Sequence, residues 1–340
     1  MSTILEVRPQ TTRTREAFSD ANGKLERIVE EVERVIIGQT RTIRMILYAL
    51  LADGHVLLEG VPGLAKTLMV SAICKAIGGE FKRIQMLPDM LPSDITGNYV
   101  FIKDRFVLEK GPIHEANFIL ADEINRTPPR TQSALLESMQ ERQITLTGGE
   151  TFPLKDPFMV LATMNPIEQE GTYRLPEAQI DRFLLKIVID YIDPENEKRM
   201  LQTKALDQRN KVASVEKVVD LEDVLSIRNE IRETVVVGDA AAEYIIAIVD
   251  ETRKKTGWDE EDKTIELIRL GASPRAIFAL RDMARVKAYA EGRDFVLPED
   301  VQFVALDVLR HRIFLEFRAA SRGWTPAEIV AQTLKKVKAP

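Results

Sequence analysis

The segment Gly60–Thr67, which reads GVPGLAKT, most strongly constrains what this chain can fold into. The apolar run 55–59 before it predicts a short buried strand. Residues 66–77 after it have the apolar spacing of a helix that ends at Gly78 and Gly79. A strand, a glycine-rich turn and a helix start form an anion site, because free backbone N–H groups and the helix dipole both favour negative charge. The segment therefore predicts an α/β fold with a phosphate-binding loop.

All eight residues of this loop are predicted nucleotide contacts. They are Gly60, Val61, Pro62, Gly63, Leu64, Ala65, Lys66 and Thr67. Lys66 is placed to reach the β and γ phosphates, and the Thr67 hydroxyl is placed to bind Mg²⁺. Ala65 stands where the usual pattern has its second Gly, which leaves two alternatives: an ordinary right-handed backbone at Ala65, or an imperfect loop. The flanking strand and helix make an ordinary Gly/Pro turn the weaker interpretation.

Two further apolar runs end in polar side chains that suit triphosphate chemistry. Asp122 and Glu123 follow the run 116–121, and Asn165 follows the run 158–164. Mg²⁺ keeps several waters, so one carboxylate beside the loop suffices, and Asp122 is the predicted carboxylate ligand. Glu123 is the predicted general base for the attacking water, and Asn165 is predicted to position that water. Asn165 also fits an ordinary turn before a proline.

Two arginines are candidates for neutralising charge on a transferred phosphoryl group. Arg182 lies in the segment 175–183 (LPEAQIDRF), and Arg275 opens a predicted helix in GASPRA. An arginine supplied by a neighbouring subunit lowers the barrier of such reactions by about 4–7 kcal/mol. The alternatives are a local ion pair of Arg182 with Asp181 or Glu177, and simple exposure of Arg275.

Composition argues against several other classes of protein. The 340 residues carry a formal net charge of −6, which disfavours nucleic acid as a partner. The single cysteine, Cys74, permits no intrachain disulfide, and no apolar run approaches the ~18 residues of a membrane span, so we expect a cytoplasmic protein. His55, His114 and His311 lie far apart without other ligands at metal-binding spacing, which argues against a zinc site.

The chain divides into three parts. Residues 1–20 are polar and aperiodic and predict a loose tail, 21–193 alternate short apolar runs with helices, and 194–340 predict a purely helical lid domain. The expected strands of a parallel sheet covered on both faces are 55–59, 81–86, 116–121, 158–164 and 184–189. Hairpins are predicted within two insertions, 88–112 and 143–155. The expected helices of the last part are 195–205, 221–234, 239–255, 274–290, 298–314 and 326–336.

Together these motifs resemble the MoxR family of AAA+ ATPases over roughly residues 30–315. The quoted sequences, in chain order, are GVPGLAKT, LPSDITG, LADEINRTPPRTQSALLESMQE, RQIT, ATMNP, LPEAQIDRF and GASPRA. The resemblance implies an αβα P-loop core with a parallel five-stranded sheet and a helical lid. It also implies a ring, commonly a hexamer, with ATP and Mg²⁺ bound between subunits. Two departures from the family pattern, Thr127 and Arg174, touch none of the assigned chemistry.

The resemblance also assigns roles to individual residues. They are Lys66 and Thr67 as Walker A, Asp122 and Glu123 as Walker B, Asn165 as sensor 1, Arg182 as arginine finger and Arg275 as sensor 2. Ile37 and Gly38, after the first predicted helix, are expected to contact the nucleotide as well. The insertion 88–112 corresponds to the helix-2 insert, and 143–155 corresponds to the pre-sensor hairpin.

The function that the resemblance implies is chaperone-like. The ring would use ATP to remodel or mature client protein complexes, including the insertion of metal cofactors, together with a partner that carries a VWA domain. Three alternatives stay open: a chelatase-type motor, a nucleic-acid translocase, and a module that binds nucleotide without hydrolysing it. Stimulation of ATPase by nucleic acid that weakens with salt would favour the translocase.

Overall fold

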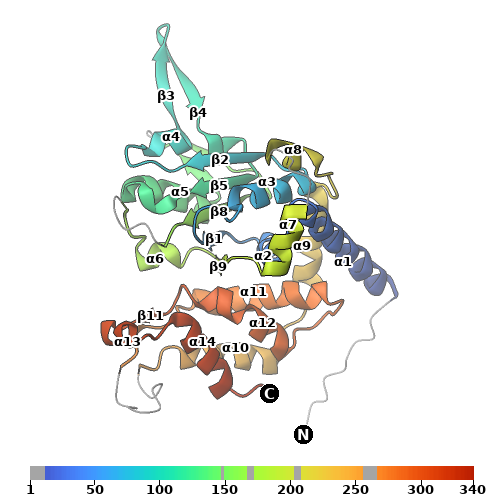
Figure 1. Ribbon diagram of the computed structural model, residues 1–340. Helices are drawn as coiled ribbons and strands as arrows, with labels where there is room; N and C mark the ends of the chain where they lie inside the picture. The colour runs from blue at the N-terminus through green and yellow to red at the C-terminus, as the bar shows by residue number, and fades with distance from the viewer. Residues whose placement is uncertain (1–11, 147–148, 167–171, 203–207, 256–265) are drawn as a thin grey trace.

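A five-stranded parallel sheet forms the centre of the core in this computed structural model (Figure 1). The described residues are 12–146, 149–166, 172–202, 208–255 and 266–340. The strands are β1 (Val56–Glu59), β2 (Phe81–Gln85), β5 (Phe118–Asp122), β8 (Met159–Met164) and β9 (Leu185–Val188). Their order is β2-β5-β8-β1-β9, and every neighbouring pair is parallel. The predicted α/β class and five-stranded sheet are confirmed.

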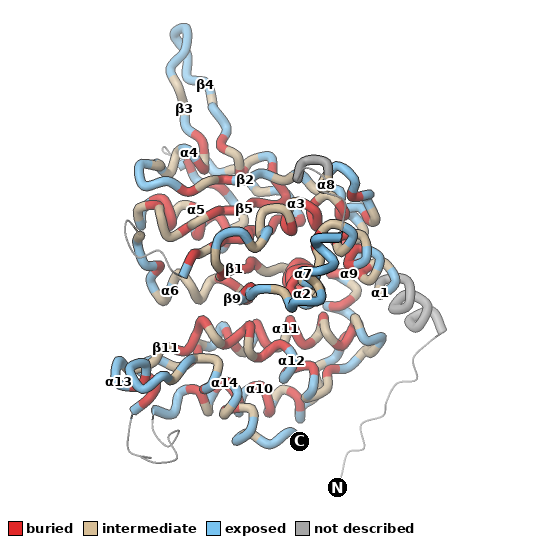
Figure 2. Tube along the Cα trace, in the orientation of Figure 1, coloured by how far each residue is buried: buried red, intermediate tan, exposed pale blue. Residues whose placement is uncertain are grey.

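Helices cover both faces of the sheet because alternate residues of each strand point to opposite sides. Leu58 and Leu120 belong to an apolar cluster with α1 (Thr12–Glu33), α2 (Thr40–Leu51) and α3 (Lys66–Ile77). Their strand neighbours Leu57 and Ile119 belong to a second cluster with α5 (Pro129–Glu141). Buried residues therefore run through the middle layer of the molecule (Figure 2). Short helical turns complete the core: η1 (Pro112–His114), η2 (Ile124–Arg126) and α6 (Glu177–Ile180).

The first helix is longer than predicted. Helix α1 begins at Thr12, so the expectation of a loose tail through residue 20 is wrong for 12–20, while 1–11 lie outside the described residues. The packed half of the helix supplies the nucleus, and extension over further helix-forming residues costs little.

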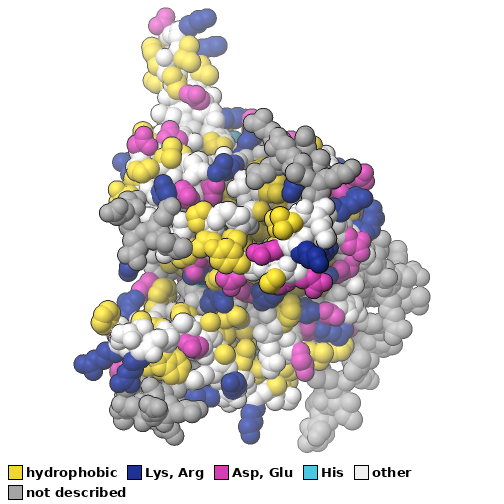
Figure 3. Space-filling model, viewed as in Figure 1, with side chains coloured by type: hydrophobic (Ala, Val, Ile, Leu, Met, Phe, Trp, Pro, Cys, Tyr) yellow, Lys and Arg dark blue, Asp and Glu magenta, His cyan; other side chains and the backbone are white. Residues whose placement is uncertain are grey.

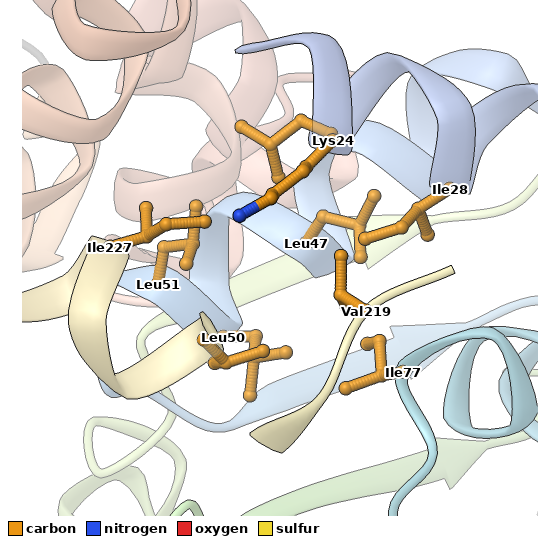
Figure 4. A pocket seen from close by; sticks show the side chains of 10 residues that line it. Lys24, Ile28, Leu47, Leu50, Leu51, Ile77, Val219 and Ile227 are labelled. Atoms are coloured by element: carbon orange, nitrogen blue, oxygen red, sulfur yellow. The ribbon is translucent and has the colours of Figure 1, made fainter. Parts of the chain in front are cut away.

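Apolar side chains of several helices pack against α1 and hold it to the rest of the molecule. Figure 4 shows Ile28 of α1 with Leu47, Leu50 and Ile77 around a cavity of only about 10 Å³. A cavity of this size barely reaches the volume of one water molecule and is a packing gap, not a ligand site. Beside it the Lys24 Nζ donates to the Asp223 carboxylate at 3.1 Å.

The first insertion forms the predicted hairpin and projects from the core (Figure 1). After α4 (Pro92–Thr96), strands β3 (Gly97–Ile102) and β4 (Arg105–Lys110) pair antiparallel through a two-residue turn at Lys103 and Asp104. Both turn residues have positive φ, which matches the twist of a tight hairpin. Hydrophobic side chains cover much of this protrusion (Figure 3); Phe101 and Phe106 are 61% and 71% exposed and their rings touch.

The second insertion also forms a hairpin. Strand β6 (Gln143–Thr145) pairs antiparallel with β7 (Thr151–Pro153), as predicted. Gly149 has a φ of +86°, as the expected glycine turn requires, whereas Gly148 lies outside the described residues.

A second layer of helices packs along the sheet layer (Figure 1). It contains α10 (Asp239–Glu251), α11 (Arg275–Ala290), α12 (Pro298–Leu309) and α14 (Pro326–Lys336). Before it, the chain forms α7 (Pro194–Gln202), α8 (Gln208–Ser214) and α9 (Leu221–Thr234). Helix α8 lies on the core, because Lys75 of α3 donates to the carbonyls of Val212 and Ala213. No helix among the residues described here combines the length and apolar character that a membrane crossing requires.

The lid is mainly helical, as predicted, but it differs from the expected elements in several places. Helix α8 was not predicted, and the expected helix 239–255 ends at Glu251. Strands β10 (Ile268–Leu270) and β11 (Phe314–Leu315) pair antiparallel, and a short helix α13 (Phe317–Ser321) follows. Runs of two or three residues are too short to show a periodicity. The expected helix 298–314 ends at Leu309, since His311 and Arg312 turn away to hydrogen-bond the core.

His55 is buried at the start of β1 in one defined tautomer. Its Nδ1 accepts the backbone N–H of Val160 at 3.0 Å, so Nε2 carries the proton and donates to the Met139 carbonyl at 3.1 Å. Burial, reinforced by the charge of Arg142, lowers the pKa of His55 to about 3. The ring is therefore neutral throughout the physiological range.

We expect acid to destabilise the protein through His55. The unfolded chain takes up a proton near pH 6.5, whereas the folded ring does so only near pH 3, so the free energy of unfolding falls as pH falls below 6.5. This histidine alone should remove about 2 kcal/mol by pH 5. Urea unfolding from pH 7 to 5 measures the loss. His55→Gln should make the curve less steep without flattening it, because burial also lowers the pKa of His311. A His55→Gln curve as steep as that of the wild type would refute the assignment.

Candidate functional site

The predicted phosphate-binding loop and acidic pair meet at the carboxyl edge of the sheet. Parallel strands end together at one edge, so the loop after β1, the carboxylates after β5 and the polar end of β8 converge there. They enclose a cavity of about 290 Å³. Its lining residues are Pro62, Gly63, Leu64, Ala65, Lys66, Thr67, Leu68, Asp122, Glu123, Thr163 and Asn165. A triphosphate needs this combination of main-chain donors, one cation and carboxylates.

The loop reaches the start of α3 through two left-handed residues. Gly63 has a φ of +91°, and Ala65, directly before the helix, has φ 54° and ψ 25°. The alternative of a right-handed backbone at Ala65 is therefore wrong, because the loop turns into the helix at this residue. Lys66 Nζ donates to the Gly60 carbonyl at 2.5 Å and stays within the cavity. Burial lowers the pKa of Lys66, and Asp122 and Glu123 oppose that shift.

Replacing Ala65 with Gly should stabilise the protein slightly. A left-handed alanine costs about 1–2 kcal/mol, of which the added flexibility of glycine in the unfolded chain offsets about 0.4–1 kcal/mol. We expect a net gain of about 0.5 kcal/mol in urea unfolding. Ala72→Gly, inside the same helix, is the matched control and should lose about 1 kcal/mol or more. Loss of stability in both variants would contradict a strained Ala65.

Thr163, to which the motif analysis gave no role, connects the Asp122 carboxylate with the backbone of Glu123. Thr163 Oγ1 donates to Asp122 Oδ1 at 2.6 Å and accepts the Glu123 N–H at 2.8 Å. The other Asp122 oxygen accepts two bonds from Arg83 of β2, at 2.6 and 3.0 Å. Thr163 lies near the end of β8, two residues before Asn165, which follows the strand. This spacing of two is the signal that could have identified Thr163, because residues two apart along a strand point to the same side.

Glu123 is held at the lip of the cavity by residues from two other segments. Its carboxylate accepts from Gln85 Nε2 at 3.1 Å and pairs with Arg126 Nε at 2.9 Å. Its φ of 61° places a non-glycine residue in the left-handed region, a strain that surrounding contacts must maintain and that is typical of functional positions. Asn165, 7% exposed, lines the same cavity.

The donor set of the cavity fits Mg²⁺ bound together with phosphates. Thr67 contributes a hydroxyl and Asp122 a carboxylate, and Mg²⁺ takes one or two protein oxygens while keeping water and phosphate ligands. Within the described parts of the chain, no group of three His, Cys, Asp or Glu side chains could hold a metal ion by itself. The site therefore suits a hydrated metal that arrives with nucleotide.

Two of the predicted nucleotide contacts lie in a neighbouring turn. Gly38 has a φ of +78°, and a Cβ there would come within 2.9 Å of the Ile192 side chain. Gln39 donates to the Asp190 carbonyl at 3.1 Å. Ile37 and Gly38 therefore belong to a turn packed on the segment after β9, and neither they nor Gly60 and Val61 line the cavity.

Both candidate arginines lie at the opposite, amino edge of the sheet. Arg182 comes three residues before β9 begins, and Arg275 begins α11. They line a separate cavity of about 300 Å³ that shares no residue with the first. Arg182 Nη1 donates to the Leu136 carbonyl at 2.8 Å, and Asp181 and Glu177 pair instead with other arginines. The local ion pairs considered for Arg182 are therefore not the ones that form.

Comparisons with known proteins agree with this geometry. Residues 55–185 match the ATPase family associated with various cellular activities (AAA), and residues 262–333 match the AAA lid domain. The chain is 43% identical over 318 residues to Chaperone MoxR1 of Mycobacterium tuberculosis, covering 93% of this chain and 82% of that protein. It is 33% identical over 311 residues to Protein MoxR of Methylorubrum extorquens, covering 88% and 89%. A solved structure of a candidate ATPase from Cytophaga hutchinsonii is 43% identical, with a TM-score of 0.85 and coverage of 96% and 97%.

The chain belongs to the MoxR family of AAA+ ATPases. In this MoxR-family protein the AAA match contains the whole first cavity and Arg182, and the lid match contains Arg275. The relatives align with this chain well beyond the P-loop, so the resemblance does not depend on one short motif.

Proposed function

We propose that this MoxR-family protein binds ATP with Mg²⁺ and hydrolyses it at the contact between adjacent subunits of a ring, commonly a hexamer. One observation carries the proposal: the phosphate loop and the two arginines lie at opposite edges of one sheet. A strand of four residues spans about 13 Å, so Arg182 and the loop of the same subunit face different neighbours. A head-to-tail arrangement brings one edge onto the other and closes into a ring.

The binding and catalytic residues of the first cavity have separate proposed roles. The backbone N–H groups of residues 63–67 and the Lys66 ammonium bind the phosphates, and Thr67 and Asp122 hold the metal. Mg²⁺, when bound, neutralises charge that develops on the phosphate oxygens. Glu123 accepts the proton of the attacking water, and Asn165 orients that water. These are the main residues proposed to act from the subunit that holds the nucleotide.

The neighbouring subunit is proposed to complete the site with Arg182 and Arg275. Both line one cavity at the amino edge, so a docked neighbour would present them together. The guanidinium of Arg182 would neutralise charge on the transferred phosphoryl group, and Arg275 would act in the same way from the lid. This assignment places both arginines in trans.

The work done with ATP is proposed to be the remodelling of a client protein in the cytoplasm. Support comes from the relative named as a chaperone. The finer proposal is maturation of protein complexes, including metal-cofactor insertion, with a VWA-domain partner. A net charge of −6 disfavours a nucleic-acid client.

A binding and turnover experiment tests the proposal. ATP with Mg²⁺ should raise the melting temperature, promote ring assembly in sedimentation, and release phosphate. DNA or RNA added to the assay should leave the rate unchanged. No melting shift at millimolar ATP and Mg²⁺ would overturn the proposal, and strong salt-sensitive stimulation by nucleic acid would replace it with a translocase.

A further inference from the structure

Arg312 holds the backbone segment that carries Arg182. It follows α12, is only 4% exposed, and directs its guanidinium at residues 181–184. It donates to Asp181 Oδ1 at 2.9 Å, Asp181 O at 3.4 Å, Phe183 O at 2.7 Å, Leu184 O at 3.1 Å and Val308 O. The neighbouring His311 adds a contact to the Phe183 carbonyl at 3.0 Å. The position of the Arg182 backbone is therefore fixed from the lid.

Asp181 joins this arginine to the second lid helix. While Oδ1 accepts from Arg312, Oδ2 accepts from Ser273 Oγ at 2.9 Å and lies 3.6 Å from Arg275 Nη1. Ser273 Oγ also accepts the N–H of Arg275 at 3.1 Å. One carboxylate thus connects the end of α12, the start of α11 and the segment before β9. We call Asp181, Ser273 and Arg312 the Asp181 clasp.

The charges within the clasp depend on each other. Burial lowers the pKa of Arg312 to about 10, and the carboxylate of Asp181 opposes this shift, so the guanidinium stays charged at neutral pH. Loss of the Asp181 carboxylate would leave the Arg312 guanidinium buried without a counter-charge, which strongly destabilises the folded state. The hydrogen bonds from Arg312 to the backbone carbonyls would then rearrange. Removal of the Asp181 charge should therefore move the segment that carries Arg182.

We propose that Asp181 and Arg312 are positioning residues that hold Arg182 and Arg275 in one fixed geometry toward the nucleotide of the neighbouring subunit. The proposal rests on the proposed function, in which both arginines act in trans. It adds that the lid sets the geometry of the finger, because Arg312 and Ser273 belong to the lid while Arg182 belongs to the core. A displacement of about 1 Å at such a position lowers turnover by about 100-fold.

The competing explanation is that the clasp is an ordinary ion pair between core and lid. The chain offers a matched control for this explanation. Asp307 of α12 is more deeply buried than Asp181, with 1% of its side chain exposed against 16%, and it pairs with Arg41 of α2 at 2.6 Å. It forms no hydrogen bond or ion pair with the described residues 181–184. Asp307→Asn removes a buried lid-to-core charge without touching the segment that carries the finger.

The experiment compares kinetics and complementation of Asp181→Asn, Ser273→Ala and Asp307→Asn. Asp181→Asn should lower kcat by about 10- to 100-fold with KM for ATP within about threefold, since the nucleotide cavity is intact. Ser273→Ala, which removes one neutral hydrogen bond, should lower kcat several-fold and remains informative if Asp181→Asn fails to fold. Asp307→Asn should lower the melting temperature and keep kcat within about twofold.

Mixed rings separate positioning from simple destabilisation. Lys66→Ala subunits lack a working loop but carry an intact finger, so mixing them with Asp181→Asn subunits should raise activity well above the average of the two. A folding defect gives no such gain, and equal behaviour of Asp181→Asn and Asp307→Asn would overturn the proposal. The Arg182→Ala and Lys66→Ala mixture is run in parallel. If only the Arg182→Ala mixture recovers activity, the positioning role of the clasp is rejected and the proposed function stands. If neither mixture recovers activity, the proposed action of the arginines in trans is rejected.

Discussion

Glu123→Gln should bind ATP as tightly as the wild type, but its turnover rate should fall by a factor of about 10²–10⁴. The amide keeps the size of the side chain and a hydrogen-bond acceptor for Gln85, but it cannot take a proton from water. The loop that binds phosphate is unchanged. Phosphate release under saturating ATP measures turnover, and a fluorescent ATP analogue measures affinity.

The control for this prediction is Glu137→Gln, an exposed glutamate on α5. It should keep wild-type turnover. Equal turnover of Glu123→Gln and the wild type would reject Glu123 as the base. If the prediction holds, the inactive ring that retains ATP also serves as a trap: affinity purification of Glu123→Gln in ATP should retain a client and a VWA-domain protein.

Arg182→Ala should lower the turnover rate by a factor of about 10³–10⁵. This factor corresponds to an activation barrier that is higher by roughly 4–7 kcal/mol. Nucleotide affinity should change little, because Arg182 lies at the edge of the sheet opposite the loop. Mixing it with Lys66→Ala should restore activity at contacts where an intact loop meets an intact finger. Single-turnover phosphate release across a series of mixing ratios measures this recovery.

Arg174→Ala is the matched control, an exposed arginine in the same region of the chain. It should retain wild-type turnover and gain nothing from mixing. Activity that stays at the level of the two separate variants in every mixture of Arg182→Ala with Lys66→Ala would contradict action in trans.

The sequence predicted the sheet and the loop well because each depends on a local pattern. Apolar runs followed by a glycine turn or an acidic pair identify β1 and β5 without tertiary information. The left-handed backbone of Ala65 was not predicted, since a single alanine gives no signal of positive φ.

Contacts between distant segments explain what the sequence did not predict. Arg83 and Gln85 reach the acidic pair from β2, about forty residues earlier in the chain, and only strand pairing brings them there. Likewise, Arg312 meets Asp181 across 131 residues. In the sequence alone, Arg312 after a predicted helix looks like any solvent-exposed basic residue, so nothing there indicates that it is buried.

The proposed division of the reaction centre between two edges of one sheet would have a metabolic consequence. A subunit set free from its neighbours would keep a pocket for nucleotide and yet lack the partner guanidinium that its reaction needs. ATP hydrolysis would then depend on how many subunits assemble, so dilution or premature release would stop turnover without an inhibitor. Cells would thereby avoid wasting ATP on chains that have no partner and no work to do.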